Sequence, residues 1–225
     1  LVGAACIGGA CIIEKFARYG RWVIRGVLPC LAMVLLILAV PWWGANVGGA
    51  VTAFAAFGVL AMLVIRRSVT WQHVAAMLAV SVIFIGGVFI LDSFRAVESQ
   101  SHMGQTVKLV KENGVQELFN IAYRKIYMNI RLFRYTIWTR VFLSSLISMV
   151  ILFYRPAGIF KDVRERYPYL FHGFISGLVG SITAFLVNDS GIVAAATSMI
   201  YVGLSFMLVI IHRLQEIIME KKNAA

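Results

Sequence analysis

The chain has 225 residues, of which 60% are apolar and only 14% are charged, and its mean hydropathy is +0.84. Soluble domains contain roughly 45–50% apolar and about 25% charged residues, so this composition excludes an ordinary soluble domain and a disordered chain. The formal net charge is +11. In a soluble protein that charge would suggest a nucleic-acid-binding surface. We expect no nucleic-acid partner here, because basic residues also set the topology of membrane proteins.

The first apolar run, residues 1–13, is too short to cross a membrane, since a transmembrane helix needs about 20 residues. No basic segment precedes this run, which is atypical of a signal peptide. We interpret the run as the end of a membrane helix that begins upstream, in the C-terminal part of a longer polytopic protein.

Later apolar runs have the length and composition of membrane-spanning helices. In lipid, only helices and closed barrels satisfy every backbone N–H and C=O group internally. Tryptophan and tyrosine residues lie at the ends of several runs, as is typical of membrane interfaces. The runs cover residues 27–40, 47–65, 71–91, 137–154, 170–187 and 192–211. We therefore predict an all-α fold, a polytopic transmembrane helical bundle with one extramembrane amphipathic helical loop.

This pattern divides the chain into three predicted segments. Residues 1–92 would hold the partial helix and three transmembrane helices. Residues 93–136 would form an external amphipathic segment in the membrane interface, and residues 137–225 would add three transmembrane helices with a tight Asn-Asp-Ser-Gly hairpin.

The distribution of basic residues predicts the orientation. Most of the 21 Lys and Arg residues fall on the side of the membrane that holds the C-terminus, and the remainder all lie between residues 93 and 140. Because cytoplasmic loops carry an excess of Lys and Arg, we expect a multi-pass cell-membrane protein with a cytoplasmic C-terminus and an external loop.

The loop is predicted to contain two helical runs. The first covers residues 106–112 and ends at Asn113-Gly114, a typical turn. The second has apolar residues every three to four positions, which predicts an amphipathic helix in the membrane interface. These apolar residues are Val115, Leu118, Phe119, Ala122, Ile126, Ile130 and Phe133.

Basic residues accompany the second run. One interpretation is attraction to anionic lipids of the membrane surface. The other is contact with the headgroup or phosphate of a lipid-linked substrate, because Arg donates charge-assisted hydrogen bonds to phosphate. The candidate residues are Arg124, Lys125, Arg131, Arg134 and Arg140.

A polar tetrapeptide, Asn188-Asp189-Ser190-Gly191, separates the last two apolar runs. Asp189 is the only acidic residue between positions 170 and 211. One interpretation is a tight hairpin at the membrane surface that caps the last helix. The other is a substrate-binding or ion-binding site formed by Asn188, Asp189 and Ser190 inside the bundle, because an ionisable residue at membrane depth is costly.

Small residues at helical spacing precede this tetrapeptide, among them Gly173, Gly177 and Gly180, and they predict close helix packing. The sequence contains no HExxH, GxSxG, phosphate-binding or dinucleotide-binding motif. We therefore predict no metal site and no cofactor, and we assign no catalytic residue.

Residues 101–104, 123–138 and 185–196 together resemble the C-terminal membrane region of large bacterial polytopic proteins of unassigned function. Some of those proteins carry an alkaline-phosphatase-like region upstream of the membrane region. The resemblance covers about half of the chain and implies a membrane segment of a larger cell-envelope protein. The metal-binding acids of such a catalytic region would lie before Leu1.

Three functions are compatible with these features. The first is an integral membrane part of a bacterial cell-envelope protein, which anchors and presents a lipid-linked or phosphorylated substrate to an extracytoplasmic activity. Its partners would be anionic membrane lipids and either an upstream domain of the same chain or other membrane subunits. The second is a transporter or flippase core with Asp189 as the binding or coupling residue. The third is a structural subunit of a membrane complex.

Overall fold

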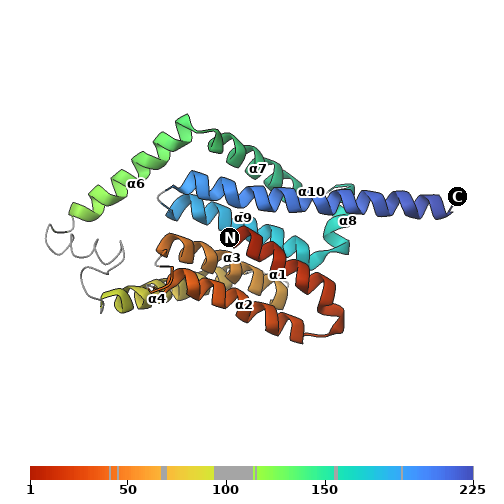
Figure 1. Cartoon of the computed structure of the whole chain (residues 1–225), viewed down its shortest axis with the longest axis horizontal. Coiled ribbons are helices and arrows are strands. Elements are labelled where there is room, and N and C mark those ends of the chain that lie inside the picture. The colour runs from red at the N-terminus through yellow and green to blue at the C-terminus, as the bar shows by residue number, and fades with distance from the viewer. Residues whose placement is uncertain are drawn as a thin grey trace.

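The computed structural model describes residues 1–40, 42–44, 46–66, 70–93, 114, 116–154, 157–188 and 190–224, and it is built of helices (Figure 1). The elements are α1 (Val2–Phe16), the short 3-10 helix η1 (Ala17–Tyr19), α2 (Trp22–Ala39), α3 (Val47–Arg66), α4 (Trp71–Ser93), α6 (Gln116–Tyr135), α7 (Ile137–Tyr154), α8 (Ile159–Arg166), α9 (Pro168–Val187) and α10 (Gly191–Ala224).

Five of these helices are long and apolar enough to cross a membrane, within the part of the chain that the structure describes. They confirm the predicted all-α fold and a polytopic membrane protein. The five segments are Trp22–Ala39, Val47–Ile65, Ile137–Tyr154, Pro168–Val187 and Gly191–Asn223.

The remaining predicted span, residues 71–91, coincides with α4. This helix is continuous over 23 residues, which at 1.5 Å per residue exceeds the ~30 Å of a bilayer core. Several of its side chains lie outside the described residues. That α4 crosses the membrane therefore stays a prediction from its length and sequence.

The N-terminal helix α1 belongs to the core of the bundle. Cys6, Ala10 and Ile13 are fully buried, and α1 packs against α9, α2, α10 and α3. Its 15 residues agree with the prediction that the first apolar run is short and helical.

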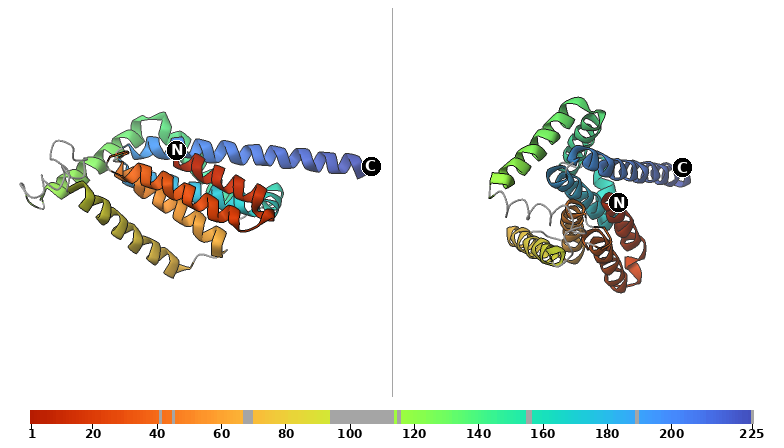
Figure 2. Two further views of the ribbon diagram at one scale, coloured as in Figure 1. Left: turned by 60° about the horizontal axis from the view of Figure 1, so that its bottom comes forward. Right: turned by 60° about the vertical axis from the view of Figure 1, so that its left-hand side comes forward.

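The long helices reverse direction from one to the next, so segments from distant parts of the chain share an end of the bundle (Figures 1 and 2). One end holds η1, α8 and the C-terminal part of α10. The other end holds the turn between α9 and α10 and the corner between α6 and α7. These are the two sides into which the apolar runs divide the chain, and the cytoplasmic assignment of the first end stays a prediction.

Helix α9 lies at the centre of the packing because its glycines admit three neighbours. A Cβ atom added at Gly173 would lie 2.5 Å from the Cβ of Ala10 on α1. One added at Gly177 would lie 2.6 Å from Val202 Cγ2 on α10, and one at Gly180 2.9 Å from the α3 alanine Ala56. The predicted close packing of this small-residue face is therefore confirmed.

A group of aromatic rings joins four helices next to α9. The ring of Phe206 on α10 contacts Phe174 on α9, Phe153 on α7 and Phe160 on α8, with centroid separations of 5.0, 5.5 and 5.9 Å respectively. Phe206 and Phe174 are almost completely buried. Aromatic pairs at these separations attract each other in addition to the area that they bury, so they fix α8 against the end of the bundle.

Helix α10 is much longer than a membrane is thick. Its 34 residues extend over about 51 Å at 1.5 Å per residue, whereas a bilayer core measures about 30 Å. Its apolar run ends at Ile211, and the charged remainder projects beyond the other helices (Figure 2).

Helix α6 leads away from the bundle (Figure 1). It meets α7 at Thr136, whose hydroxyl donates to the carbonyl oxygen of Leu132 at 2.8 Å. The predicted second helical run of the loop is thus a helix. The first run, 106–112, and Asn113 lie outside the described residues, while Gly114 has φ +78°, a conformation that glycine adopts readily.

Candidate functional site

The outer surface of α6 carries a stripe of large apolar side chains. Phe119, Tyr123, Ile126 and Ile130 are each at least 60% exposed, and Phe133 is 41% exposed. The side chains of Val115, Leu118 and Ala122, which the sequence places on the same stripe, lie outside the described residues. An exposed apolar surface of this kind marks an interaction site. On a helix beside a membrane bundle, it fits insertion into the interface.

Basic side chains lie beside the apolar stripe on the same helix. Arg124 and Arg131 are two helical turns apart and therefore share a side, and both are exposed. Arg134 is also exposed, and its guanidinium lies 5.9 Å from the ring centroid of Tyr135. Lys125 belongs to α6, but its side chain lies outside the described residues.

Arg140 occupies a different helix from the other basic candidates. It is exposed in the first part of α7, one turn after the corner at Thr136. The structure thus gives α6 three described arginines and places Arg140 on the neighbouring helix.

A groove of about 670 Å³ lies beside the corner between α6 and α7. Its chemistry combines one guanidinium, two phenol hydroxyls and two apolar side chains. Such donors suit a phosphate oxygen, and the apolar side chains suit the chain to which a phosphate is attached. The groove is lined by Tyr127, Met128, Arg131, Leu132 and Tyr135.

The polar turn between α9 and α10 lies at the same end of the bundle as this groove. Asn188 Nδ2 donates to Thr52 Oγ1 on α3 at 3.2 Å and to the carbonyl oxygen of Ala184 at 3.1 Å. A Cβ atom added at Gly48 would lie 2.6 Å from Asn188 Oδ1. Asn188 therefore joins the end of α9 to the start of α3.

The backbone of this turn is closely fitted. The carbonyl oxygen of Ser190 accepts hydrogen bonds from the N–H groups of Val193 and Ala194 at 3.0 and 3.1 Å and so begins α10. A Cβ atom at Gly191 would lie 2.1 Å from the carbonyl oxygen of Phe185, so glycine is required there. Asp189 lies outside the described residues. The contacts of its neighbours favour the hairpin interpretation, and a binding role for Asp189 stays a hypothesis.

A second group of polar residues, at the opposite end of the bundle, centres on Arg213 of α10. Arg213 is only 7% exposed. Its Nε atom donates to Asp162 of α8, and one terminal nitrogen donates to Glu216 at 3.0 Å and to Glu220 at 3.2 Å. One cation thus joins three carboxylates from two helices.

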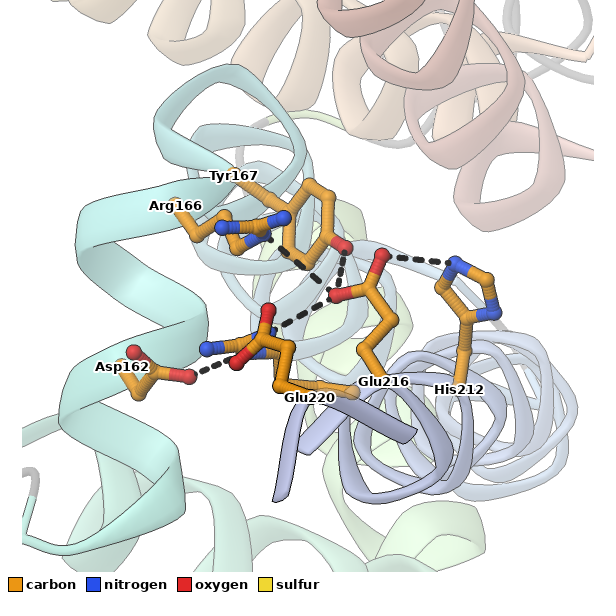
Figure 3. Close-up of polar contacts among 7 residues, drawn as sticks. Asp162, Arg166, Tyr167, His212, Glu216 and Glu220 are labelled. Carbon is orange, nitrogen blue, oxygen red and sulfur yellow. Dashed lines mark hydrogen bonds and ion pairs between the residues drawn. The ribbon is translucent and has the colours of Figure 1, made fainter. Parts of the chain in front are cut away.

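Glu216 extends this group toward the start of α9 (Figure 3). It accepts a hydrogen bond from the Tyr167 hydroxyl at 3.1 Å and lies 3.4 Å from both Arg166 Nε and His212 Nε2. We call Asp162, Arg166, Tyr167, His212, Arg213, Glu216 and Glu220 the α8–α10 polar cluster.

The cluster shifts the pKa of groups on α8 and at the start of α9. The hydrogen bond from Arg213 holds the pKa of Asp162 below its ordinary value. Loss of hydration through burial raises the pKa of Tyr167. Asp162 therefore stays charged well into the acidic range.

No pattern in the sequence predicts the α8–α10 polar cluster as a whole. Residues 155–168 had the composition of a charged connecting loop, yet Ile159–Arg166 is a helix. The spacing of Arg213, Glu216 and Glu220 on one helix could have indicated local ion pairs. Asp162 is separated from Arg213 by 51 residues, so only the fold reveals that contact.

Comparisons of the chain with protein-family models, curated proteins and solved structures give no match. The description that these findings support is a helical protein whose described residues include five candidate membrane spans. Within the described ranges, no three His, Cys, Asp or Glu side chains are grouped so that they could hold a metal ion.

Proposed function

We propose that this chain is the membrane part of a bacterial cell-envelope protein, in which α6 holds a lipid-linked, phosphorylated substrate at the membrane surface for an extracytoplasmic activity. The observation that carries the proposal is the surface of α6. A helix that leaves the bundle exposes an apolar stripe, and Arg124, Arg131 and Arg134 lie beside that stripe.

This arrangement matches an amphiphile whose two parts differ in polarity. Burial of the apolar stripe in the acyl region of the membrane lowers the free energy by roughly 25 cal/mol per Å² of buried apolar surface. The arginines then lie at the level of the headgroups, where they can donate to phosphate. The groove lined by Tyr127, Arg131 and Tyr135 offers such donors at the end of α6.

The chemical step would come from a partner, because the sequence carries none of the common catalytic motifs. An upstream domain of the same chain, or another membrane subunit, would act on the substrate that α6 presents. This part of the proposal rests on the resemblance of residues 101–104, 123–138 and 185–196 to the C-terminal membrane region of large bacterial polytopic proteins of unassigned function. Anionic lipids would be further partners of the basic side.

The proposal is tested by retention of a defined probe. The full chain is placed in phosphatidylcholine nanodiscs, and a radiolabelled long-chain isoprenoid monophosphate is titrated. Replacement of both Arg131 and Arg134 by Gln should weaken retention at least about tenfold, because a hydrogen bond to a charged group contributes about 1.5–3 kcal/mol.

The double variant K221Q/K222Q is the matched control. It removes the same charge from exposed lysines of the projecting end of α10, and its retention should equal that of the unaltered chain. Equal retention by R131Q/R134Q and the unaltered chain would contradict the proposal. An equal loss in both double variants would show that net charge alone is responsible, which would also contradict it.

A further inference from the structure

Six large apolar side chains form a line along one side of α10, from its membrane-spanning run into the part that projects beyond the bundle. Successive members are four, three, four, three and four residues apart, and each is between 36% and 64% exposed. This alternation is the heptad pattern of coiled coils, in which one line of a helix faces a second helix. We call Ile200, Leu204, Met207, Ile211, Leu214 and Ile218 the α10 line.

The bundle packs against another side of α10. On that side Met199, Val202 and Phe206 are at most 2% exposed, and Arg213 is held by the α8–α10 polar cluster. Helix α10 is therefore fixed to its own bundle without the α10 line, which stays available for a second contact.

Lipid can cover only part of the α10 line. The apolar run of α10 ends at Ile211, and at 1.5 Å per residue Ile218 lies about 10 Å further along the helix. The headgroup layer on either side of the hydrocarbon core is only about 5–8 Å thick. Ile218 therefore lies in water, on the part of α10 that projects beyond the other helices (Figures 1 and 2). An exposed apolar line that continues from lipid into water indicates a protein partner.

The residue types of the α10 line indicate which partner it takes. In the heptad pattern Ile211 and Ile218 occupy position a, and Leu214 occupies position d. A β-branched residue at a with leucine at d favours a parallel coiled coil of two strands. A second copy of this chain in the same membrane has the same orientation, so its α10 is parallel and presents the same residues at the same depth. Such a contact is self-complementary, because each residue meets its counterpart about a two-fold axis.

The charges of α10 permit this pairing as far as Ile218. Positions e and g, which flank the line and face the partner helix, are uncharged up to this point: they hold Leu208 and Gln215 on one side and Ile210 and Ile217 on the other. The next d position is Lys221. Two lysines would repel each other there, so the contact ends after Ile218.

The contact is also large enough for a specific pair. Each copy contributes the six residues of the line, and the flanking side chains of Tyr201 and Leu208 are 52% and 67% exposed. Two copies paired over this length would bury on the order of 1,000 Å² in total, which reaches the lower limit of specific interfaces.

We propose that this chain forms a parallel homodimer through the α10 line, with Ile211, Leu214 and Ile218 of the two copies paired from the membrane surface into water. The dimer uses α10 and none of the residues assigned to substrate binding on α6. It is therefore independent of the proposed function.

The test measures the oligomeric state of the full chain by sedimentation equilibrium in density-matched neutral detergent micelles. We expect the mass of two chains, with dissociation on dilution. I218S should raise the dissociation constant at least about tenfold, because both copies lose an apolar contact at position a. M219S is the matched control: Met219 is 64% exposed, as Ile218 is, but lies outside the line. Its dissociation constant should equal that of the unaltered chain.

A second measurement separates loss of pairing from loss of folding. Because both side chains are exposed, the thermal unfolding temperatures of I218S and M219S, each diluted until it is monomeric, should agree within about 2 °C.

The register is tested by disulfide formation in proteoliposomes, in a chain whose Cys6, Cys11 and Cys30 are replaced by Ser. In a parallel pair the two copies of residue 214 lie opposite each other. Leu214→Cys should therefore form a linked dimer on mild oxidation with copper phenanthroline at a high ratio of lipid to protein. Met219→Cys should stay monomeric under the same conditions.

The inference is overturned if the unaltered chain has the mass of one chain at every concentration, or the mass of three or more. It is also overturned if I218S dimerises like the unaltered chain, or if I218S and M219S weaken the dimer equally. Equal linking at positions 214 and 219 would contradict the assigned line.

Discussion

Asp162 shows how a single contact between distant residues stabilises one end of this protein. Its carboxylate accepts a hydrogen bond from Arg213, which is 51 positions away and only 7% exposed. The contact holds α8 against α10. Exposed pairs such as Lys161 and Glu165, 3.8 Å apart with both side chains about two-thirds exposed, contribute little by comparison.

The lowered pKa of Asp162 predicts a pH dependence of stability. A carboxyl group with a lowered pKa in the folded state stabilises that state above its ordinary pKa, and this stabilisation is lost as the pH falls toward the lowered value. The thermal unfolding temperature of the unaltered chain should therefore exceed that of Asp162→Asn by a constant amount above about pH 5. The difference should begin to shrink as the pH falls below about 4, the ordinary pKa of an aspartic acid.

The matched control for this prediction is Lys161→Gln, which removes an exposed ion pair of the same helix. Its unfolding temperature should follow that of the unaltered chain at every pH. A difference between Asp162→Asn and the unaltered chain that does not change with pH would contradict the assigned role of the Asp162 charge.

Asp189 is the residue at which the two interpretations of the α9–α10 turn differ. If the turn is a hairpin, Asp189→Asn should leave both the unfolding temperature and the retention of the isoprenoid monophosphate unchanged. A dithionite assay in proteoliposomes measures whether a fluorescent phosphatidylglycerol crosses the bilayer. Crossing that the unaltered chain catalyses and Asp189→Asn abolishes would support the transporter alternative and count against the hairpin.

At the scale of elements, α9 organises the bundle through its glycines. Gly173→Ala adds a Cβ atom that would lie 2.5 Å from the Cβ of Ala10, so α1 and α9 must move apart. We expect a loss of roughly 1–3 kcal/mol of stability, as is typical of overpacked cores. Thermal unfolding in micelles measures it. Gly8→Ala is the control, because nothing lies within 4 Å of the added Cβ atom, and an unfolding temperature equal to that of Gly173→Ala would contradict this account.

The elements could be predicted from sequence where their determinants are local. Long apolar runs predict the membrane spans. Apolar residues spaced three to four positions apart predict α6, because an α-helix repeats every 3.6 residues. Contacts between elements could not be predicted in the same way. Glu14 and Leu170 are 156 residues apart, and neither residue has a local signal for the hydrogen bond from the Leu170 N–H to the Glu14 carboxylate.

The candidate site on α6 could also be predicted only in part from the sequence. The sequence identified the arginines of α6 and the apolar stripe beside them. It did not predict the groove lined by Tyr127, Arg131 and Tyr135 of α6, because the shape of a groove depends on the side-chain conformations that the fold allows. Asn188 keeps two interpretations, and the fold adds that Thr52 and Gly48 lie beside it, which no local sequence signal indicates.

At the scale of the whole molecule, the two ends of the bundle differ in chemistry. One end carries α6 with its arginines, and the other carries the α8–α10 polar cluster and the projecting part of α10 (Figures 1 and 2). By the positive-inside rule, the second end is predicted to face the cytoplasm.

This orientation can be measured with single cysteines in a chain whose Cys6, Cys11 and Cys30 are replaced by Ser. In intact spheroplasts, a membrane-impermeant maleimide should label Gln116→Cys at the start of α6. Asn223→Cys near the end of α10 should be labelled only after permeabilisation. The reverse pattern would contradict the orientation, and it would place the proposed substrate on the cytoplasmic side.

The central claim is that α6 lies in the membrane interface with its apolar stripe facing the acyl chains and its arginines facing the lipid headgroups and water. Spin labels attached through Ile130→Cys and Arg124→Cys, in proteoliposomes of the otherwise cysteine-free chain, measure this directly by collision with oxygen and with a water-soluble nickel complex. The account predicts that the label at position 130 collides mainly with oxygen and the label at position 124 mainly with nickel. Equal and high nickel accessibility at both positions would place α6 in water and contradict it.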